Sequence, residues 1–191
     1  MKLLLTTILF SVFTTSLFAQ KLLNPEVKAG TVLYYDAYLK NAGSNAQLEL
    51  TFIETNDPIK MHWSVTDYGK GEWEMQTEAL NNALKTTLEP PEPDHTTKMK
   101  KDETLLVLSR AAYAEAIKNN SFQLNGMKFN VIADTAVYRI NNNRPVASFH
   151  AITDNKKAEV WILNNPNFPL LLQGKNLTKG IDFWLMDVKQ K

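Results

Sequence analysis

The chain has 191 residues, with 21 basic and 20 acidic side chains and a formal net charge of +1. A balance this close to neutrality gives no electrostatic basis for binding nucleic acid or an anionic membrane. The absence of cysteine excludes disulfides, thiol catalysis and cysteine-ligated metal sites.

The first residues have the pattern of a secretory signal peptide. Lys2 supplies a positive charge, Leu3 to Phe18 carries no charge, and Leu17 and Ala19 stand where a cleavage site would place them. The uncharged run is near the lower limit for a membrane span, about 18 residues, which leaves a retained anchor as the alternative. We expect residues 1–19 to be removed, so that an exported protein without a transmembrane segment remains, in the periplasm or outside the cell.

The mature chain is expected to be one β-rich domain, residues 20–191. The removed segment holds one Lys and no acidic residue, so 172 residues remain with 20 basic and 20 acidic side chains. A chain of this length can bury roughly 70% of its unfolded surface. It can therefore fold without disulfides, and without a Cys at the cleavage point it is not a lipoprotein.

The N-terminal half of the mature chain reads as strands. Ala46 to Glu54 and Ile59 to Asp67 alternate between apolar and polar residues, which is typical of half-buried strands. Tyr68 to Lys70 is expected to form a three-residue hairpin loop in which Gly69 supplies a positive φ. The resulting register places Val65 opposite Trp73, Trp63 opposite Met75, Ser64 opposite Glu74, and His62 on the polar face opposite Gln76. The predicted strands of this half are Gly30 to Lys40, Ala46 to Glu54, Ile59 to Asp67 and Gly71 to Thr77.

Two short helices interrupt the strands. Thr77 to Lys85 and Ser109 to Asn120 have apolar residues at helical spacing, with Thr77 and Ser109 as their N-caps. The segment between them is rich in proline and charge, and it is expected to be a surface loop over about 89–102. A short buried strand, Thr104 to Ser109, leads into the second helix.

Strands return in the C-terminal half, with turn signals about every ten residues. One hairpin, Glu159 to Gln173, sets two apolar runs around a turn at Asn164 to Phe168. This spacing favours an antiparallel sheet over repeated βαβ units. The predicted fold is therefore mostly β: an antiparallel curved sheet or half-barrel with two short helices. The remaining predicted strands include Thr135 to Ile140, Val146 to Thr153 and Gly180 to Lys189.

Three stretches of this sequence resemble a known class of protein. "GKGEWEMQTEALNNA", "TLLVLSRAAYAEAIK" and "AEVWILNNPNFPLLLQG…IDFWLMDVK" are similar to segments of secreted Bacteroidetes domains of unknown function. The last stretch also resembles the half-barrel family of outer-membrane lipoprotein carriers and their secreted relatives. This resemblance implies an exported protein with a curved sheet and an apolar concave face, and it brings no catalytic residue to carry over.

No common enzyme motif occurs in the sequence. It contains no G-x-S-x-G, no H-E-x-x-H and no Gly-rich phosphate loop. His62, near Glu72 and Glu74, either forms an acid–base pair or a metal corner with Glu74 or belongs to a solvated sheet face. His95 is either a metal ligand with Asp94 or a residue of a mobile loop, and His150 reads as half-buried and hydrogen-bonded. We expect no cofactor and no bound metal.

The aromatic residues indicate a possible function more clearly than the histidines do. Several strands are apolar on both faces, which is compatible with a groove on the concave face or with helices covering that face. The functional interpretation is an apolar groove that takes a lipid, a peptide or a partner strand, and the alternative is that the same residues fill the core. The candidate groove residues are Trp63, Trp73, Trp161, Leu172 and Trp184.

The sequence thus favours an exported, non-catalytic protein that binds an apolar, lipid-like ligand or an envelope protein on a curved β-sheet. Two alternatives stay open. One is a structural or assembly protein of the cell envelope, and the other is a hydrolase that acts on an envelope polymer.

Overall fold

The computed structural model describes residues 22–88, 91–133, 137–141 and 143–190. The predicted signal peptide, residues 1–19, lies outside the described residues. Helices α1 and α2 span Thr77–Asn82 and Arg110–Asn119. The strands are β1 Thr31–Leu39, β2 Ser44–Glu54, β3 Ile59–Val65, β4 Gly69–Met75, β5 Lys85–Thr87, β6 Thr96–Lys98, β7 Glu103–Leu105, β8 Ser121–Leu124, β9 Met127–Ile132, β10 Arg139–Ile140, β11 Arg144–Pro145, β12 Ser148–Thr153, β13 Glu159–Leu163, β14 Leu171–Thr178 and β15 Ile181–Gln190.

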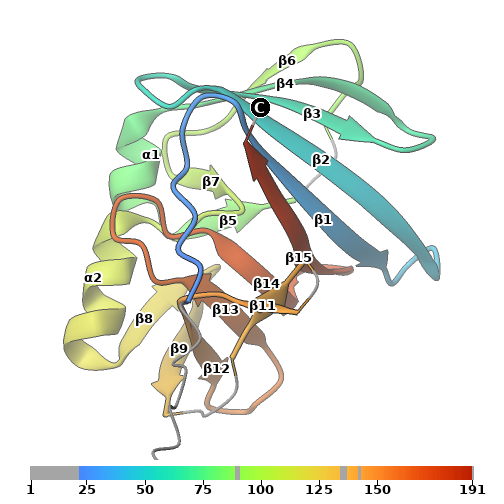
Figure 1. Cartoon of the computed structure of the whole chain (residues 1–191). Helices are drawn as coiled ribbons and strands as arrows, with labels where there is room; N and C mark the ends of the chain where they lie inside the picture. The colour runs from blue at the N-terminus through green and yellow to red at the C-terminus, as the bar shows by residue number, and fades with distance from the viewer. Residues whose placement is uncertain (1–21, 89–90, 134–136, 142, 191) are drawn as a thin grey trace, which may run out of the picture.

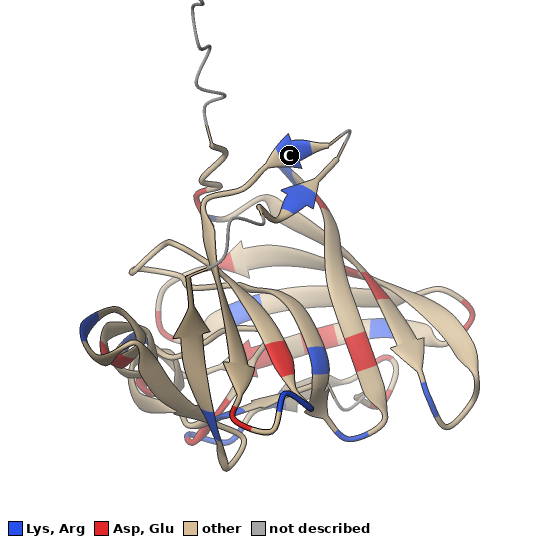
Figure 2. Cartoon of the chain, turned by 90° about the horizontal axis from the view of Figure 1, so that it is seen from below, with Lys and Arg blue, Asp and Glu red and all other residues tan. Residues whose placement is uncertain are grey.

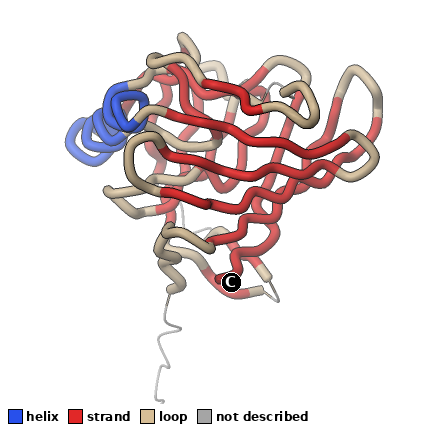
Figure 3. The backbone as a smooth tube through the Cα atoms, turned by 90° about the horizontal axis from the view of Figure 1, so that it is seen from above, coloured by secondary structure: helices blue, strands red, loops and turns tan. Residues whose placement is uncertain are grey.

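Eleven of these strands form one large sheet, in the order β6-β4-β3-β2-β1-β15-β14-β13-β12-β9-β8. Its neighbouring strands are antiparallel except for the parallel pair β4–β6. The sheet curves around β5 and β7 without closing into a barrel (Figure 1). Both helices lie together at one end of it (Figure 3). The prediction of a mostly β protein with a curved antiparallel sheet and two short helices is confirmed.

The two faces of the sheet differ in composition. Along β1, the residues Leu33 and Tyr35 are buried on the face that we call inner, while Tyr34 and Asp36 are partly exposed on the outer face. A buried stretch, residues 105–108, crosses the inside of the curve, where Val107 forms an isolated bridge with Leu170. The core is therefore built between the inner face and this internal segment.

Two tyrosine hydroxyls bind carbonyls close to where β14 and β15 diverge. β14 pairs with β15 at Gln173 and Gly174, and the two strands separate on the side of Leu171 and Leu172. The hydroxyl of Tyr138 donates to the carbonyls of Leu172 and Leu185, at 2.8 and 3.1 Å. From β1, the hydroxyl of Tyr35 donates to the carbonyl of Leu171 at 2.8 Å. Tyrosine hydroxyls thus donate to three buried main-chain carbonyls in this region.

Strands β3 and β4 form a hairpin as predicted, but the register of their pairing differs from the predicted one. Val65 pairs with Gly69 and Trp63 with Gly71, so the loop is Thr66 to Tyr68. Gly69 has a positive φ (150°), as predicted, and Asp67 in the loop has another (62°). The predicted pairings of Val65 with Trp73 and of His62 with Gln76 are wrong. The shift moves every pairing by an even number of residues, so each side chain keeps its face.

The apolar hairpin is built from β13 and β14. Its turn lies between Leu163 and Leu170, whose backbone groups are hydrogen-bonded at 2.8 Å, and this interval contains the predicted turn at Asn164 to Phe168. Both runs that flank the turn are buried on both sides of the sheet.

The segment predicted as a loop at 89–102 contains a short edge strand. Residues 89–90 lie outside the described residues, and β6 then runs parallel to β4. The backbone N–H of Asp94 donates to the carbonyl of Lys70, and that of Glu72 donates to the carbonyl of His95. These bonds fix the segment to the sheet edge. Basic and acidic positions are interspersed along the described chain (Figure 2).

The helix caps agree with the prediction at one helix and differ at the other. Ser109 caps α2, because its side chain accepts a hydrogen bond from the N–H of Ala112 at 3.3 Å. At α1 the N-cap is Gln76 instead of Thr77, and the N–H of Thr77 donates to the carboxylate of Asp57 in the β2–β3 turn. An acidic side chain from a distant turn thus accepts a hydrogen bond at the start of α1, the capping role that the sequence predicted for Thr77.

The caps give a direct prediction. We expect Ser109→Ala to lower the free energy of unfolding by about 1 kcal/mol, because a buried N–H at the start of α2 loses its acceptor. Thr77→Ala is the matched control, and it should cost a small fraction of that amount. Urea denaturation of both variants measures the difference, and equal losses would contradict the assignment of the caps.

Candidate functional site

An apolar opening lies on the inner side of the sheet, at the ends of strands β1 to β4. This opening, which we call the mouth, has a volume of about 320 Å³ and lies where the β1–β2 and β3–β4 loops end the sheet. Its volume is at the lower end of the range for small-molecule sites, about 300–1,000 Å³. It is lined by Ala37, Leu39, Ser44, Asn45, Ala46, Leu48, Val65, Thr66, Asp67, Tyr68, Trp73, Leu88, Pro91 and Ile181.

The mouth exists because small residues meet on adjacent strands. Ala37 of β1 pairs directly with Ala46 of β2, and the next inner pair along these strands is Tyr35 with Leu48. Cross-strand partners have Cβ atoms about 5 Å apart, so two methyl groups leave space that larger partners would fill. The space is therefore a consequence of register, which brings two alanines together at the open end of the sheet.

The wall and the rim of the mouth are chemically distinct. Trp73 forms part of the wall, and behind it Trp63 packs with Trp73 and Tyr68 at ring-centre distances of 5.7 and 6.1 Å. The hydroxyl of Tyr68 donates to the carbonyl of Pro91 at 3.0 Å, which ties the hairpin loop to the segment opposite. Polar Asn45 stands at the rim. A ligand with an apolar body and a polar end matches this arrangement.

Of the candidate groove residues, the structure brings Trp63 and Trp73 together. Trp73 is 4% exposed and lines the mouth, whereas Trp63 is 1% exposed and belongs to the core behind it. Of these two Trp residues, Trp73 therefore lines the mouth and Trp63 packs behind it.

The other three candidates lie elsewhere. Trp161 stacks on His150, with ring centres 4.3 Å apart and planes at 8°. Leu172 is fully buried, and its carbonyl accepts the Tyr138 hydroxyl. Trp184 is partly exposed on the outer face, where it lines a separate groove with Tyr38. The sequence did not single out the alanines and loop residues that make the mouth.

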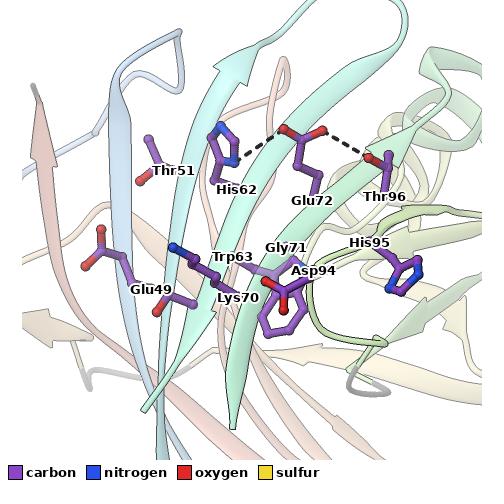
Figure 4. A pocket seen from close by; sticks show the side chains of 11 residues that line it. Glu49, Thr51, His62, Trp63, Lys70, Gly71, Glu72, Asp94, His95 and Thr96 are labelled. Carbon is purple, nitrogen blue, oxygen red and sulfur yellow. Dashed lines mark hydrogen bonds and ion pairs between the residues drawn. The ribbon is translucent and has the colours of Figure 1, made fainter. Parts of the chain in front are cut away.

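A second, polar groove lies on the outer face near the β6 edge (Figure 4). It has a volume of about 560 Å³ and is larger than the mouth. We call it the polar groove, and its lining residues are Glu49, Thr51, His62, Trp63, Ser64, Lys70, Gly71, Glu72, Asp94, His95 and Thr96.

In the polar groove, two rows of polar side chains run across neighbouring strands. In the first row, His62 Nδ1 lies 3.5 Å from Glu72 Oε1, and the hydroxyl of Thr96 donates to Glu72 Oε2 at 3.2 Å (Figure 4). The side chains of His62 and Glu72 are 57% and 39% exposed. In the second row, Ser64 lies opposite Lys70. Glu72 can orient the imidazole, but among the described residues no hydrogen bond found joins the His62 ring directly to a hydroxyl group.

The remaining histidines have local partners. His95 Nδ1 lies 2.8 Å from the carbonyl of Pro93, and its ring turns away from the centre of the polar groove (Figure 4). His150 Nε2 lies 3.6 Å from Glu159 Oε1, beneath Trp161. Within residues 22–88, 91–133, 137–141 and 143–190, no three His, Asp or Glu side chains are grouped so that they could hold a metal ion.

Comparisons with known proteins give no relative for this chain. No family model, no curated protein and no solved structure matches it. The resemblance to secreted Bacteroidetes domains and lipoprotein carriers therefore remains a prediction. None of the described helices is both long and apolar enough to cross a membrane.

Proposed function

We propose that this chain is an exported, non-catalytic protein that binds the apolar part of a lipid-like ligand in the mouth. The observation that carries the proposal is the apolar space beside Ala37 and Ala46, at the open end of the inner face. Each methylene transferred from water into such a space contributes about 0.8 kcal/mol. The resemblance to lipoprotein carriers and the predicted signal peptide support the same function.

The polar rim suggests how such a ligand would be oriented. Ser44, Asn45 and Asp67 stand at the outer margin of the mouth, while Leu48, Val65 and Trp73 line its apolar wall. An apolar chain would enter between the two hairpin loops and leave its polar end at the rim. An acyl chain on an envelope protein would meet the same surface, so a free lipid and a lipidated partner share this chemistry.

The test is a pair of adjacent substitutions with opposite expected outcomes. Ala46→Phe fills the mouth, so we expect it to weaken binding of a fluorescent fatty acid at least about tenfold, or 1.4 kcal/mol. Gln47→Phe puts the same ring on the exposed outer face one residue later and should leave binding unchanged. Fluorescence titration of the wild-type chain and both variants gives the dissociation constants.

Two outcomes would contradict the proposal. One is an absence of saturable binding by the wild-type chain. The other is equal weakening by Ala46→Phe and Gln47→Phe, which would place the fatty acid outside the mouth. Urea denaturation of each variant checks that the fold is retained.

A further inference from the structure

A further groove borders the mouth at the same end of the sheet. It has a volume of about 510 Å³ and is lined by β5, the start of β7, the β8–β9 turn and the β14–β15 turn. We call it the Asn125 groove, after the residue of the β8–β9 turn that lines it. Leu88 and Ile181 line both this groove and the mouth, so these two apolar side chains form the boundary between them. A ligand that fills the mouth can therefore continue past this boundary into the Asn125 groove.

The side chain of Asn125 fixes the elements that build this groove. Its oxygen accepts a hydrogen bond from the N–H of Thr86 at 2.8 Å, and its nitrogen donates to the carbonyls of Thr86 and Leu177, at 3.1 and 3.0 Å. One side chain thus joins β5, the β8–β9 turn and β14, which lie far apart in the sequence. Because these bonds are made to main-chain groups, the groove is already formed before a ligand binds, as is usual for small-molecule sites.

The Asn125 groove offers one charge of each sign to a ligand. Lys179 lines it from the β14–β15 turn and Glu103 from the start of β7. None of the ion pairs found among the described residues uses either of these side chains. The other charged residue of the lining, Lys85, is already paired, with its Nζ 2.8 Å from Asp102 Oδ2. An ammonium and a carboxylate, from separate elements, therefore remain for a bound molecule.

The charges at the two margins of the mouth differ. Asp67, at the rim, is the only charged residue among the described residues that line the mouth, and it repels a phosphate. On the side of Leu88 and Ile181, a phosphate meets Lys179 in the Asn125 groove, and hydrogen bonds from an ammonium group to a phosphate are among the strong ones. A head group that also carries an ammonium group can use Glu103 in the same way. The two free charges of the groove thus complement a zwitterionic head.

We propose that the Asn125 groove binds the zwitterionic head group of a free phospholipid whose acyl chain occupies the mouth. The phosphate lies next to Lys179 and the ammonium group next to Glu103, and the chain passes Leu88 and Ile181 into the mouth. This inference rests on the proposed function, because the acyl chain needs the mouth as its binding site. It adds the class of head group, and it favours a free lipid over an acylated envelope protein, whose acyl chain ends in no such head.

Three amphiphiles with the same dodecyl chain test the head group on the full chain. Dodecylphosphocholine carries a phosphate and an ammonium group, dodecyl phosphate carries the phosphate alone, and dodecyl maltoside carries no charge. Displacement of the fluorescent fatty acid, below the critical micelle concentrations, gives their dissociation constants. We expect Lys179→Gln and Glu103→Gln each to weaken dodecylphosphocholine about threefold, the effect of losing an exposed ion pair. Both variants should bind dodecyl maltoside as the wild-type chain does, and Glu103→Gln should not weaken dodecyl phosphate.

A control variant and a control ligand complete the test. Lys128 is an exposed lysine of β9 that lines neither the mouth nor the Asn125 groove, so Lys128→Gln should leave binding of dodecylphosphocholine unchanged. In ¹⁵N NMR spectra, dodecylphosphocholine should shift the amide signal of Gly126, which lines the groove. Inorganic phosphate at the same concentration should not shift it, because the head group is held in place by the chain in the mouth.

The possible failures are distinguishable. Unchanged binding of dodecylphosphocholine in Lys179→Gln and Glu103→Gln, equal weakening by Lys128→Gln, or an equal Gly126 shift with inorganic phosphate would overturn the inference and leave the proposed function standing. If none of the three amphiphiles binds, the mouth does not hold a dodecyl chain, and the proposed function is contradicted together with the inference.

Discussion

Replacing Gly174 by alanine is expected to cause a large loss of stability. A Cβ at this position would lie 2.5 and 2.7 Å from two ring carbons of Phe183, and 3.2 Å from a methyl carbon of Leu177. Phe183 is 1% exposed and packs edge-on against Tyr35, with ring centres 6.0 Å apart, so it has little room to move. Overpacking of this kind costs about 1–3 kcal/mol, and sometimes more. Urea denaturation of Gly174→Ala measures the loss.

A double-mutant cycle shows whether the ring is the cause. Phe183→Leu shortens the side chain that meets the new methyl group, so Gly174→Ala should cost less in that background than in the wild-type chain. The expected coupling lies within the usual range for residues in contact, about 0.5–3 kcal/mol. Strictly additive effects of the two substitutions would contradict the close approach of Gly174 and Phe183.

The second large effect is expected at Tyr138. Tyr138→Phe keeps the ring and removes the hydroxyl that donates to the carbonyls of Leu172 and Leu185. Leaving a buried acceptor without its donor costs about 1–3 kcal/mol. We therefore expect a loss of this size near neutral pH by urea denaturation. Tyr38→Phe, at an exposed tyrosine of the outer face, is the control and should leave stability nearly unchanged.

The same residue predicts how stability depends on alkaline pH. Burial raises the pKa of Tyr138 above its ordinary value of about 10, and a backbone hydrogen bond at Leu185 opposes this in part. Burial also raises the pKa of Tyr35, with a smaller contribution from Tyr138. Above pH 10 the unfolded chain loses these protons while the folded chain retains them. The free energy of unfolding must therefore fall as pH rises above about 10, by up to about 1.4 kcal/mol per pH unit for each group.

Comparing the two chains across this pH range separates the effects. Tyr138→Phe should be less stable than the wild-type chain at pH 7. It should lose stability less steeply above pH 10, because it lacks the hydroxyl proton that the folded wild-type chain retains and the unfolded chain loses. Urea denaturation at a series of pH values gives both slopes. A steeper slope in the variant, or equal slopes, would contradict the assignment of Tyr138 as a buried, protonated group.

The strands and their buried faces were predictable because side chains alternate with a period of two. The patterns of β2 and β3 correctly identified Leu50 and Trp63 as inward residues and His62 as outward. Runs that are apolar on both faces, such as Val160 to Leu163, were ambiguous between a groove and a covered core. The internal segment 105–108, packed inside the curve, supplies a cover, and it could not be placed from local sequence.

The hairpin register was not predictable, because both Gly69 and Asp67 have a positive φ. Gly69 has a φ of 150°, as predicted, but Asp67, with a φ of 62°, takes the central position of the loop. Gly69 lies in β4, where a Cβ would be 2.8 Å from Pro93, so close packing against a distant loop also requires glycine there. This contact spans more than twenty positions, and no local pattern indicates it.

The candidate sites were predictable only in part. The apolar composition of β3 and β4 indicated Trp73 as a wall residue, and the sequence placed His62 near Glu72. The mouth itself depends on the pairing of Ala37 with Ala46, and the polar groove depends on β6 reaching the sheet edge beside Glu72. Both are products of register between segments that the sequence alone does not align.

The most direct test of the central claim is to observe the mouth while a short fatty acid is added. Methyl NMR spectra of the full chain, titrated with laurate, should show saturable shifts at Ala37, Ala46 and Val65. The methyl groups of Ala151 and Val160, which are buried and outside the lining of the mouth, should not shift. An absence of saturable shifts at the mouth, or shifts of equal size at Ala151 and Val160, would contradict the assignment of the mouth as the site of an apolar ligand.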